Sequence, residues 1–496
     1  MQEYPTLAAV DLGSNSFHLQ VARVEGEQLF YLDAHKEAVR LAAGLTADKT
    51  LDAASQRRAL DCLSRFGERL KGMPAGAVRA VGTSALRVAK NAPEFMQQAR
   101  AALGFDIEVV SGREEARLIY LGVAHSLPLN KDKRLVVDIG GGSTECILGV
   151  GYEPHERESL RMGCVVYTQR YFPDGVLDRQ AFRAAETAAR IEIQTAAHGF
   201  RRGHWSEAVG SSGTARALGE ILRANGRSDG SITLDGLVWL RERLIKAGSL
   251  PALELAGLKS DRRPVIAGGF SIMLAIFQEL GIDSMTVAQG AMREGILWDL
   301  LGRVHDRDMR DVTVAQFMRR YHVDGRQARR VERLAQELAQ SLRPGVRGLG
   351  AEALHLLSWA ALLHEIGISI AHSGFHKHGA YILENADMPG FSRQDQAALA
   401  SLVRASRGGL NKLTLANDDP LWPLIVCLRL AVLFNLSRTD ARPGQLGLEC
   451  QAGRCVLRVS AAWLEANPLT QAALEAELRE WEGVTAWVRL TGLRPV

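Results

Sequence analysis

One sequence pattern occurs twice in this chain of 496 residues. An apolar run ends in Asp, an apolar residue and Gly, and small and hydroxyl residues follow at once, first at residues 10–16 and again at residues 137–144. The two aspartates, Asp11 and Asp138, lie 127 residues apart, which is about the length of one domain. The repeat therefore predicts an internal duplication, with two related α/β domains that face each other.

The residues around these two motifs alternate between strand and helix patterns. Short apolar runs bounded by turn residues predict strands, and apolar residues at helical spacing predict helices. On this basis we expect strands at 7–10, 17–24, 78–81, 107–110, 135–137 and 146–150, helices at 57–70 and 114–123, and two further strand-to-glycine turns at 209–214 and 265–269. This alternation is typical of α/β domains.

The pattern changes after about residue 302. Residues 303–347 hold 11 arginines against 6 acidic residues, and Val331, Leu334, Leu338 and Leu342 form an apolar stripe at helical spacing. Strand patterns return only at 446–450, 455–459 and 487–490, around a helix expected at 470–481. We therefore expect four parts, namely two α/β domains at 1–124 and 125–303, an all-helical domain at 304–442 and a small α/β domain at 443–496.

Composition limits the class of protein. Hydrophobic residues make up 47% and charged residues 23%, as in globular chains, and 60 basic against 56 acidic residues leave a net charge of only +4. A polyanion site must therefore be a local basic patch, and nothing indicates nucleic-acid binding. Six cysteines without metal-type spacing fit a reducing compartment. The start has no signal-type pattern, and Arg429 interrupts the apolar segment 421–436, so we expect a cytoplasmic protein, with peripheral membrane association left open.

The repeated turn suits phosphate for a physical reason. Glycine lets the backbone turn tightly and bring N–H groups within reach of anionic oxygens. Hydroxyl and amide side chains add donors, and an aspartate at a strand end can hold Mg²⁺ directly or through water. An ordinary β-hairpin turn is the alternative for either copy alone, and two copies at domain spacing favour the phosphate site.

Three segments carry a family resemblance. Residues 11–18 (DLGSNSFH), 111–120 (SGREEARLIY) and 138–145 (DIGGGSTE) resemble the exopolyphosphatase/guanosine pentaphosphate phosphohydrolase family. The resemblance implies two actin-like (ribonuclease-H-like) domains with the active site in the cleft between them, a helical third domain related to the HD phosphohydrolases, and a small C-terminal domain. It also implies Mg²⁺ and removal of terminal phosphate from inorganic polyphosphate, or of the 5′-terminal phosphate from guanosine pentaphosphate (pppGpp).

The second of these segments supplies the candidate general base. Glu114 and Glu115 lie at the start of an expected helix, where neighbouring side chains point about 100° apart, so at most one of them faces the cleft. The residues alone do not choose between them, and both could be ordinary carboxylates of a helix N-terminus. The family resemblance assigns the base to Glu115, which would orient and deprotonate the attacking water. It also assigns a metal-associated carboxylate to Glu145, for which a solvated strand residue is the alternative.

Other segments resemble the family's phosphate-binding parts. Arg87 follows Thr83 and Ser84, and its guanidinium offers planar paired donors to a phosphate, with an ordinary surface arginine as the alternative. Arg40 is a weaker candidate, and residues 210–214 match the position where superfamily relatives hold a nucleoside. The expected phosphate-binding set is Gly13, Ser14, Asn15, Ser16, Thr83, Ser84, Arg87, Gly140, Gly141, Gly142, Ser143, Thr144, Ser212 and Gly213, with Asp11, Asp138 and Glu145 as metal ligands.

The third domain departs from the HD pattern at three ligand positions. Gln327 stands where a His is common, His364-Glu365 replaces His-Asp, and residues 430–433 lack the distal Asp. A working metal site is therefore not expected there. The role expected instead is a basic track that guides polyphosphate, with a solvated basic surface as the alternative. Its residues are Arg329, Arg330, His376, Lys377 and His378, together with Arg404.

The expected function is that of a processive, Mg²⁺-dependent exopolyphosphatase that releases orthophosphate from chain ends. Guanosine pentaphosphate 5′-phosphohydrolase, with the same chemistry on a nucleotide, is the nearest alternative. A non-catalytic polyphosphate or nucleotide sensor would keep the turns and lose the base, and a sugar-type kinase would transfer phosphate from ATP. The family resemblance also implies a homodimer.

Overall fold

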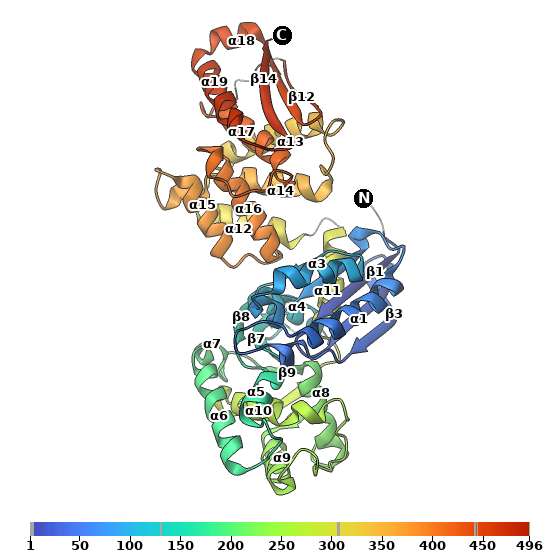
Figure 1. The fold of residues 1–496 in the computed structure, drawn as a ribbon. Helices are drawn as coiled ribbons and strands as arrows, with labels where there is room; N and C mark the ends of the chain where they lie inside the picture. Colours follow the sequence, from blue (N-terminus) through green and yellow to red (C-terminus); the bar gives the residue numbers. More distant parts are fainter. Residues whose placement is uncertain (1–3, 129–130, 305–307, 441–442, 444, 496) are drawn as a thin grey trace. The chain divides into compact units, whose positions relative to one another are not determined.

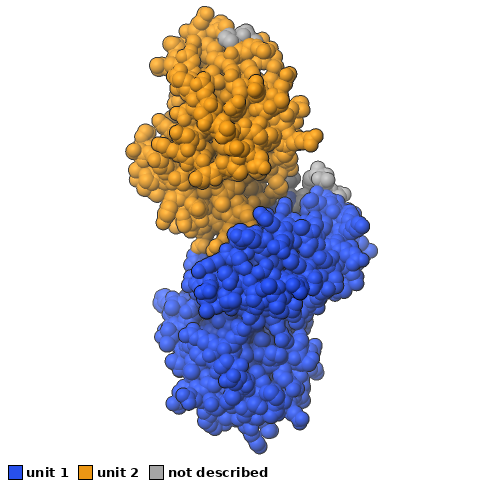
Figure 2. Space-filling model, viewed as in Figure 1, with its two compact units in different colours: residues 1–309 blue, residues 310–496 orange. Residues whose placement is uncertain are grey.

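The computed structural model describes residues 4–495 apart from 129–130, 305–307, 441–442 and 444. The chain divides into two compact units, unit 1 at residues 1–309 and unit 2 at residues 310–496 (Figure 2). The expected boundary after residue 442 falls at residues outside the described part of the chain. The finer division of each unit into domains stays a prediction.

Unit 1 begins with a five-stranded sheet in the order β3-β2-β1-β4-β5. Its strands are β1 (Thr6–Leu12), β2 (Phe17–Glu25), β3 (Gln28–Glu37), β4 (Val78–Gly82) and β5 (Ile107–Val109). The first three form an antiparallel meander, whereas β4 pairs parallel with β1 and β5 parallel with β4. Its helices are α1 (Ala53–Leu70), α2 (Ser84–Val88), α3 (Ala92–Leu103) and α4 (Gly112–His125), with 3-10 turns at Leu41–Gly44 and Ala75–Ala77.

The second sheet of unit 1 repeats this plan in the order β10-β11-β9-β6-β7-β8. Its strands are β6 (Arg134–Ile139), β7 (Thr144–Val150), β8 (Glu153–Leu160), β9 (Glu207–Ser211), β10 (Ile232–Thr233) and β11 (Ser284–Val287). Strands β6 to β8 again form an antiparallel meander, and β9 again pairs parallel with the first strand. Asp11 and Asp138 each precede the last residue of the first strand of their sheet. The predicted duplication is thus confirmed in the fold.

One helix of this second half, α11 (Met292–Val304), packs with α4 of the first half and so connects the two sheets. The others are α5 (Cys164–Tyr171), α6 (Arg179–Gln194), α7 (Ala197–Phe200), α8 (Ser212–Ala224), α9 (Leu234–Ala247) and α10 (Ile266–Leu280). Helices α4 and α11 lie side by side (Figure 1). They share one buried apolar cluster with strands of both sheets. That cluster includes Leu7 and Val81 of the first sheet and Val136 and Val209 of the second. The α4–α11 pair therefore fixes both sheets to a common core.

One expected turn is a helix instead. Residues 265–269 were expected to leave a strand, but they form the end of a 3-10 turn (Arg263–Val265) and the start of α10. The two glycines serve close packing: a Cβ on Gly268 would lie 2.6 Å from the Cys164 carbonyl oxygen of α5. The stretch Arg263–Leu280 is long and apolar enough to cross a membrane, yet 78% of it is buried inside the fold. Its hydropathy is that of a core helix.

Unit 2 is helical up to its C-terminal part. Its helices are α12 (Met309–Arg320), α13 (Gly325–Leu342), α14 (Ala351–Leu363), α15 (Phe375–Asn385), α16 (Arg393–Ala405), α17 (Trp422–Phe434), α18 (Ala461–Ala466) and α19 (Pro468–Glu482), with 3-10 turns at Ile366–Ser369 and Leu410–Lys412. A three-stranded sheet in the order β12-β13-β14 is built from β12 (Leu446–Gln451) and β13 (Arg454–Val459), which precede α18, and β14 (Arg489–Pro495), which follows α19. Its apolar residues share one buried cluster with the helices.

The arginine that interrupts the apolar helix α17 has a specific partner. Arg429 donates from Nε and Nη2 to the two carboxylate oxygens of Glu477 on α19, at 2.6 and 2.7 Å. Its Nη1 donates to the carbonyl oxygens of Ala405 and Gly408. Because all of its donor groups find acceptors, this buried charge fixes α19 against α17 rather than leaving an unpaired ion in the core.

Candidate active site

The two glycine turns meet in space. The first turn, residues 13–16, connects β1 to β2, and the second, residues 140–143, connects β6 to β7. A Cβ placed on Gly141 would lie 2.9 Å from the backbone nitrogen of Asn15, and one on Gly142 would lie 3.1 Å from Ser14 Oγ. Only glycine permits so close an approach of the two turns. Residues 126 and 128 positions apart are thus in close contact.

A small cleft of about 110 Å³ lies between the turns. Residues of both turns line it, together with groups from the surrounding strand and helix ends. The lining includes Asp11, Gly13, Ser14, Asn15, Ser16, Thr83, Glu115, Asp138, Gly140, Gly141, Gly142, Ser143, Ser212 and Gly213. Most of the residues expected from the sequence are therefore brought to one place.

The structure separates the two candidate bases. Glu115 lines the cleft. Glu114 points elsewhere, because its carboxylate accepts both Nε and Nη2 of Arg117 at 2.8 Å. Both belong to the first turn of α4, which Ser111 caps by accepting the Glu114 N–H at 3.2 Å. The cap fixes the start of the helix, and with it the direction of Glu115.

Arg87 contacts the candidate general base, Glu115, and is not among the residues that line the cleft. Its Nη1 donates to Glu115 Oε2 at 2.6 Å and to the Val110 carbonyl oxygen at 3.1 Å. Both side chains are nearly buried, at 11% and 9% exposed. The Arg87 guanidinium therefore holds the Glu115 carboxylate in place at the edge of the cleft. The expected role of Arg87 as a direct phosphate ligand stays a prediction.

Three other expected residues lie outside the residues that line the cleft. Thr144 is fully buried and its hydroxyl donates to the Met162 carbonyl oxygen at 2.6 Å. Ser84 begins α2, where it lies against Gly142. Glu145 is buried and accepts the Ser159 hydroxyl at 2.8 Å. Arg40 braces the first turn through its backbone N–H, which donates to the Asn15 carbonyl oxygen at 2.7 Å.

The carboxylates around the cleft are short of positive charge. Burial, followed by the charge of Glu115, raises the pKa of Asp11 to about 8, and burial raises that of Asp138 to about 6. Burial and then Glu115 also raise the pKa of Glu145 well above its ordinary value. In addition, Asp11 Oδ1 is buried with no hydrogen-bond partner. These groups together would favour a bound cation.

The donor set fits Mg²⁺ shared with a phosphate better than a closed metal cage. Across the described residues, no three His, Cys, Asp or Glu side chains are arranged to hold a metal ion by themselves. Mg²⁺ keeps several waters and is usually held by one or two carboxylates together with substrate phosphates. Asp11 and Asp138 meet that requirement, because both line the cleft between the glycine turns. Asp11 also has a buried oxygen without a hydrogen-bond partner.

A larger cavity of about 900 Å³ adjoins the cleft, with which it shares lining residues. Six basic and three acidic side chains line it, and two of the basic ones are paired within the wall, Lys36 with Asp261 and Arg223 with Glu220. The shared residues are His18, Gly213, Arg216, Arg262 and Arg293, and Lys36, Arg223 and Lys259 line the cavity farther out. The three shared arginines come from three segments, namely α8, the loop before α10, and α11.

These cations repel one another. Burial and then Arg293 lower the pKa of Arg216, and burial and then Arg262 lower that of Lys36. The same surroundings lower the pKa of His18 to about 3, so its ring is neutral. An anion would relieve this repulsion. Sequence reasoning missed these residues. Arg216 follows the expected turn at 210–214 by two positions and could have been found, whereas Arg262 and Arg293 stand in no recognisable motif.

Two family models cover most of the chain. The model of the Ppx/GppA phosphatase family matches residues 20–304, and the model of domain III of that family matches residues 309–478. The chain belongs to the Ppx/GppA phosphatase family. The first match starts at residue 20, so the place of the first glycine turn rests on the geometry described above.

Solved structures agree with the Ppx/GppA fold. An exopolyphosphatase from Cytophaga hutchinsonii is 25% identical with a TM-score of 0.54, and the alignment covers 60% of this chain and 98% of that one. An exopolyphosphatase-like protein is 23% identical with a TM-score of 0.56, covering 61% and 100%, which shows a shared fold. A PPX-GPPA enzyme from Aquifex aeolicus is 25% identical with a TM-score of 0.49, covering 59% and 98%. The family models and the Cytophaga hutchinsonii structure confirm the actin-like fold expected for this family.

The Ppx/GppA domain III of this chain holds an arginine among the HD ligand positions. Arg438 donates to Glu365 Oε1 at 2.5 Å and to Asp324 Oδ2 at 3.0 Å. The Gln327 amide donates to the Asn435 carbonyl oxygen, and His364 is buried with Nδ1 2.7 Å from the Ala361 carbonyl oxygen. These side chains are occupied by protein contacts, so they do not fit an HD-type metal site.

The residues of the expected basic track lie on three helices of unit 2, with Arg404 exposed on α16. Arg329 on α13 is exposed, whereas its neighbour Arg330 donates to Asp440 at 2.7 Å. On α15, Lys377 is exposed and His376 and His378 are half-buried. Helix α13 packs on α14 and α17, whereas α15 packs on α16. A continuous track through these residues stays a prediction.

Proposed function

We propose that this protein is a Mg²⁺-dependent exopolyphosphatase that hydrolyses the terminal phosphoanhydride of inorganic polyphosphate. One observation carries the proposal. The two glycine turns, which are in contact, line a single small cleft together with Glu115. Phosphoryl transfer asks a protein mainly for positioning and for stabilisation of negative charge. The turns supply the positioning, and one nearby carboxylate can act on a water.

In this proposal each group has a distinct task. Backbone N–H groups and hydroxyls of residues 13–16 and 140–143 hold the oxygens of the terminal phosphate. Glu115 orients the attacking water and takes its proton, while the contact from Arg87 holds the Glu115 carboxylate in place. The proton then leaves with the released orthophosphate or with bulk water. Thr83, Ser212 and Gly213 complete the wall around the terminal phosphate.

Mg²⁺ belongs to the same proposal. Asp11 and Asp138 would hold it, and Glu145 would add negative charge behind them. When bound, the ion would neutralise charge on the phosphate oxygens. The raised pKa values of the three carboxyl groups support a cation at this position.

The adjoining cavity bears on the choice of substrate. Its wall is rich in Arg and Lys and includes no Phe, Tyr or Trp among the described residues. Such a wall suits the further phosphates of a chain, because arginine and lysine donate to phosphate oxygens. It offers a purine arginine planes to stack on, but no aromatic ring. A volume of about 900 Å³ would nevertheless accept a nucleoside. Guanosine pentaphosphate 5′-phosphohydrolase is therefore the second candidate function.

The deciding experiment measures orthophosphate release by the purified full-length chain. Long-chain polyphosphate and pppGpp are offered at matched concentrations, with Mg²⁺ and with EDTA. The proposal expects Mg²⁺-dependent release with a higher kcat/KM on polyphosphate. A preference for pppGpp would assign the second function. Binding of either ligand without release of phosphate would instead identify a non-catalytic sensor and overturn the proposal.

A further inference from the structure

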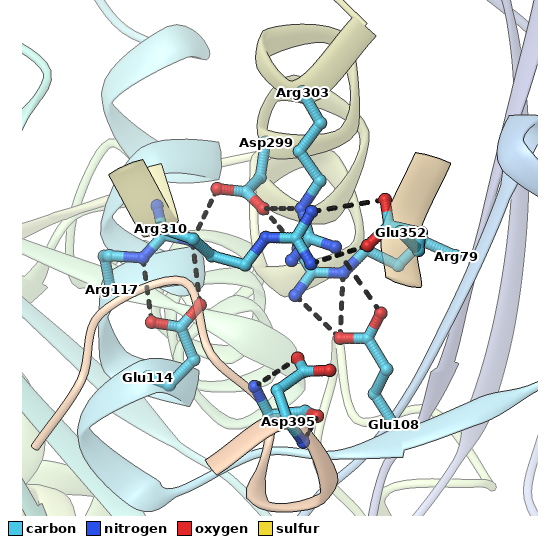
Figure 3. A network of polar contacts seen from close by, with 10 residues as sticks. Arg79, Glu108, Glu114, Arg117, Asp299, Arg303, Arg310, Glu352 and Asp395 are labelled. Carbon is cyan, nitrogen blue, oxygen red and sulfur yellow. Dashed lines mark hydrogen bonds and ion pairs between the residues drawn. The ribbon is translucent and has the colours of Figure 1, made fainter. Parts of the chain in front are cut away.

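A buried network of charged side chains lies behind the first turn of α4 (Figure 3). Asp299 of α11 stands at its centre. One carboxylate oxygen accepts Arg117 Nη2 at 2.5 Å, and the other accepts Arg79 Nη1. The Nε of Arg303 lies 3.3 Å from the second oxygen. Asp299 therefore joins α11 to α4 through Arg117 and to β4 through Arg79.

The network is balanced in charge and shielded from water. In the contacts that the structure describes around Asp299, three guanidiniums face three carboxylates, since Arg79 also donates to Glu108 and Arg117 also donates to Glu114. Asp299 is 7% exposed, Arg117 4% and Arg79 3%. Burial alone would raise the pKa of Asp299, but Arg117 and Arg79 hold it well below its ordinary value. Removing this one charge would leave two buried arginines with unpaired donors.

The network reaches the proposed base through two consecutive residues. Arg117 holds both oxygens of Glu114, and Glu114 directly precedes Glu115. Glu114 and Arg117 are three positions apart and share one face of α4, whereas Glu115 points about 100° away from Glu114. A small rotation of the first turn would move the Glu115 carboxylate within the cleft. Because Glu114 and Arg117 belong to the same helix, the contact that opposes this rotation is the one from Arg117 to Asp299 of α11.

Helix α11 is a suitable anchor for this restraint. Its first residues, Met292 and Arg293, line the cleft, and Asp299 lies two turns farther on. A Cβ on Gly295 would overlap the Leu118 carbonyl oxygen, so the backbones of α11 and α4 are in direct contact. Helix α11 contacts both the cleft and α4. A contact from Asp299 to α4 therefore fixes the position of Glu115 relative to the cleft wall.

We infer that Asp299 is a positioning residue, which acts through Arg117 and Glu114 to aim the Glu115 carboxylate into the cleft. Asp299 is not among the residues that line the cleft. The inference rests on the proposed role of Glu115. A merely structural ion pair would contribute to stability alone, whereas a positioning residue also sets kcat, because a misplacement of about 1 Å can cost on the order of 10²-fold in rate.

The test is a double-mutant cycle on phosphate release. Asp299→Asn should lower kcat about 10-fold or more and change KM less than about twofold, because the misplaced base acts only in the chemical step. In the Glu115→Gln background the same substitution should lower kcat no further, since the group that it positions is gone. An equal factor in both backgrounds, or an unchanged kcat in Asp299→Asn, would overturn the inference.

Glu477→Gln is the matched control. Glu477 is also buried and also accepts two donors of one arginine, Arg429, but it belongs to α19 of unit 2. It should lower the melting temperature and leave kcat unchanged. If Asp299→Asn fails to fold, Glu114→Gln takes its place in the cycle, because it weakens the contact between Arg117 and Glu114, the next one in this network.

A second readout separates this inference from the proposed function. Amide hydrogen exchange of residues 112–118 should quicken in Asp299→Asn and stay unchanged in Glu477→Gln, whether or not substrate is turned over. If the wild-type chain releases no phosphate, the proposed function fails, and exchange alone decides whether the network holds α4. Unchanged exchange in Asp299→Asn would overturn the inference even if the wild-type chain is active.

Discussion

Glu114 and Glu115 are neighbours in the first turn of α4, yet their carboxylates serve different partners. Glu114 accepts both donors of Arg117 inside a buried network. Glu115 accepts Arg87 at 2.6 Å and lines the cleft between the two glycine turns. One carboxylate thus fixes the helix and the other is left for chemistry, an arrangement that the helical angle between adjacent residues makes possible.

The contact between the two turns gives the first prediction. Gly141→Ala would place a Cβ 2.9 Å from the Asn15 backbone nitrogen, so the turns must move apart. We expect KM for polyphosphate to rise about 10-fold, the cost of roughly 1.4 kcal/mol of lost binding. Steady-state kinetics check this. Gly447→Ala is the control, because nothing lies within 4 Å of its Cβ. Unchanged KM in Gly141→Ala would show that the turn contact does not shape the phosphate site.

The cationic cavity gives a prediction about substrate. Arg262→Gln and Arg216→Gln each remove one charge from the wall shared with the cleft. If that wall holds the phosphates that follow the terminal one, KM should rise several-fold for polyphosphate and less for a pyrophosphate-sized substrate, and added salt should weaken the binding of long chains most. Kinetics on polyphosphates of graded length, each at low and high salt, test this. Equal effects on all lengths would place the following phosphates elsewhere.

A third prediction concerns pH and metal. The pKa of Asp11 is about 8 in the folded chain against an ordinary value of 3.8. Between about pH 4 and pH 8 the unfolded chain therefore binds fewer protons than the folded one, so stability without metal falls as the pH rises. Asp11→Asn should make this slope shallower and raise the melting temperature at pH 8 by about 2 °C or more.

Metal should act in the opposite direction in the same window. Added Mg²⁺ should raise the melting temperature of the wild-type chain at pH 8 and less at pH 5, where the carboxyl groups are protonated. Scanning calorimetry with and without Mg²⁺ measures both effects. A melting temperature that is indifferent to Mg²⁺ at pH 8, or an Asp11→Asn variant as pH-sensitive as the wild type, would exclude the proposed metal position.

The expected basic track is tested at its exposed member. Arg329→Glu is a cleaner change than the same reversal at Arg330, which is paired with Asp440. It should raise KM for long polyphosphate more than for short, because a track acts only on chains that extend beyond the cleft. Arg183→Glu on α6 of unit 1 has the same charge change at an exposed site. If KM depends on chain length in the same way in both variants, the effect comes from the net charge of the protein, and the basic track is excluded.

Much of the site could be predicted because it is local in the sequence. The duplicated turns, the strands that carry them and the start of α4 all lie within short motifs. An aspartate followed by glycine and then by hydroxyl residues, directly after a strand, is a pattern with few functions. The choice between Glu114 and Glu115 could not be made from the residues alone, because it depends on where Arg117 points.

What the sequence could not give depends on contacts between distant segments. Residues 265–269 looked like a strand end because Gly268 and Gly269 follow an apolar run, but those glycines serve helix packing against α5. Arg262 and Arg293 carry no motif, and only the fold brings them beside His18. The role of Asp299 could not be predicted from the sequence either, since its partners Arg117 and Arg79 lie about two hundred residues away.

The most direct test of the account compares phosphate release by the wild-type chain and by Glu115→Gln with polyphosphate and Mg²⁺. Glu153→Gln, an exposed carboxylate on β8, is the control. General-base catalysis typically contributes 10²–10⁴-fold, so kcat of Glu115→Gln should fall by about 10² or more, while polyphosphate binding measured by calorimetry stays within about twofold. A Glu115→Gln variant that turns over polyphosphate at the wild-type rate would contradict the assignment of Glu115 and, with it, the proposed site.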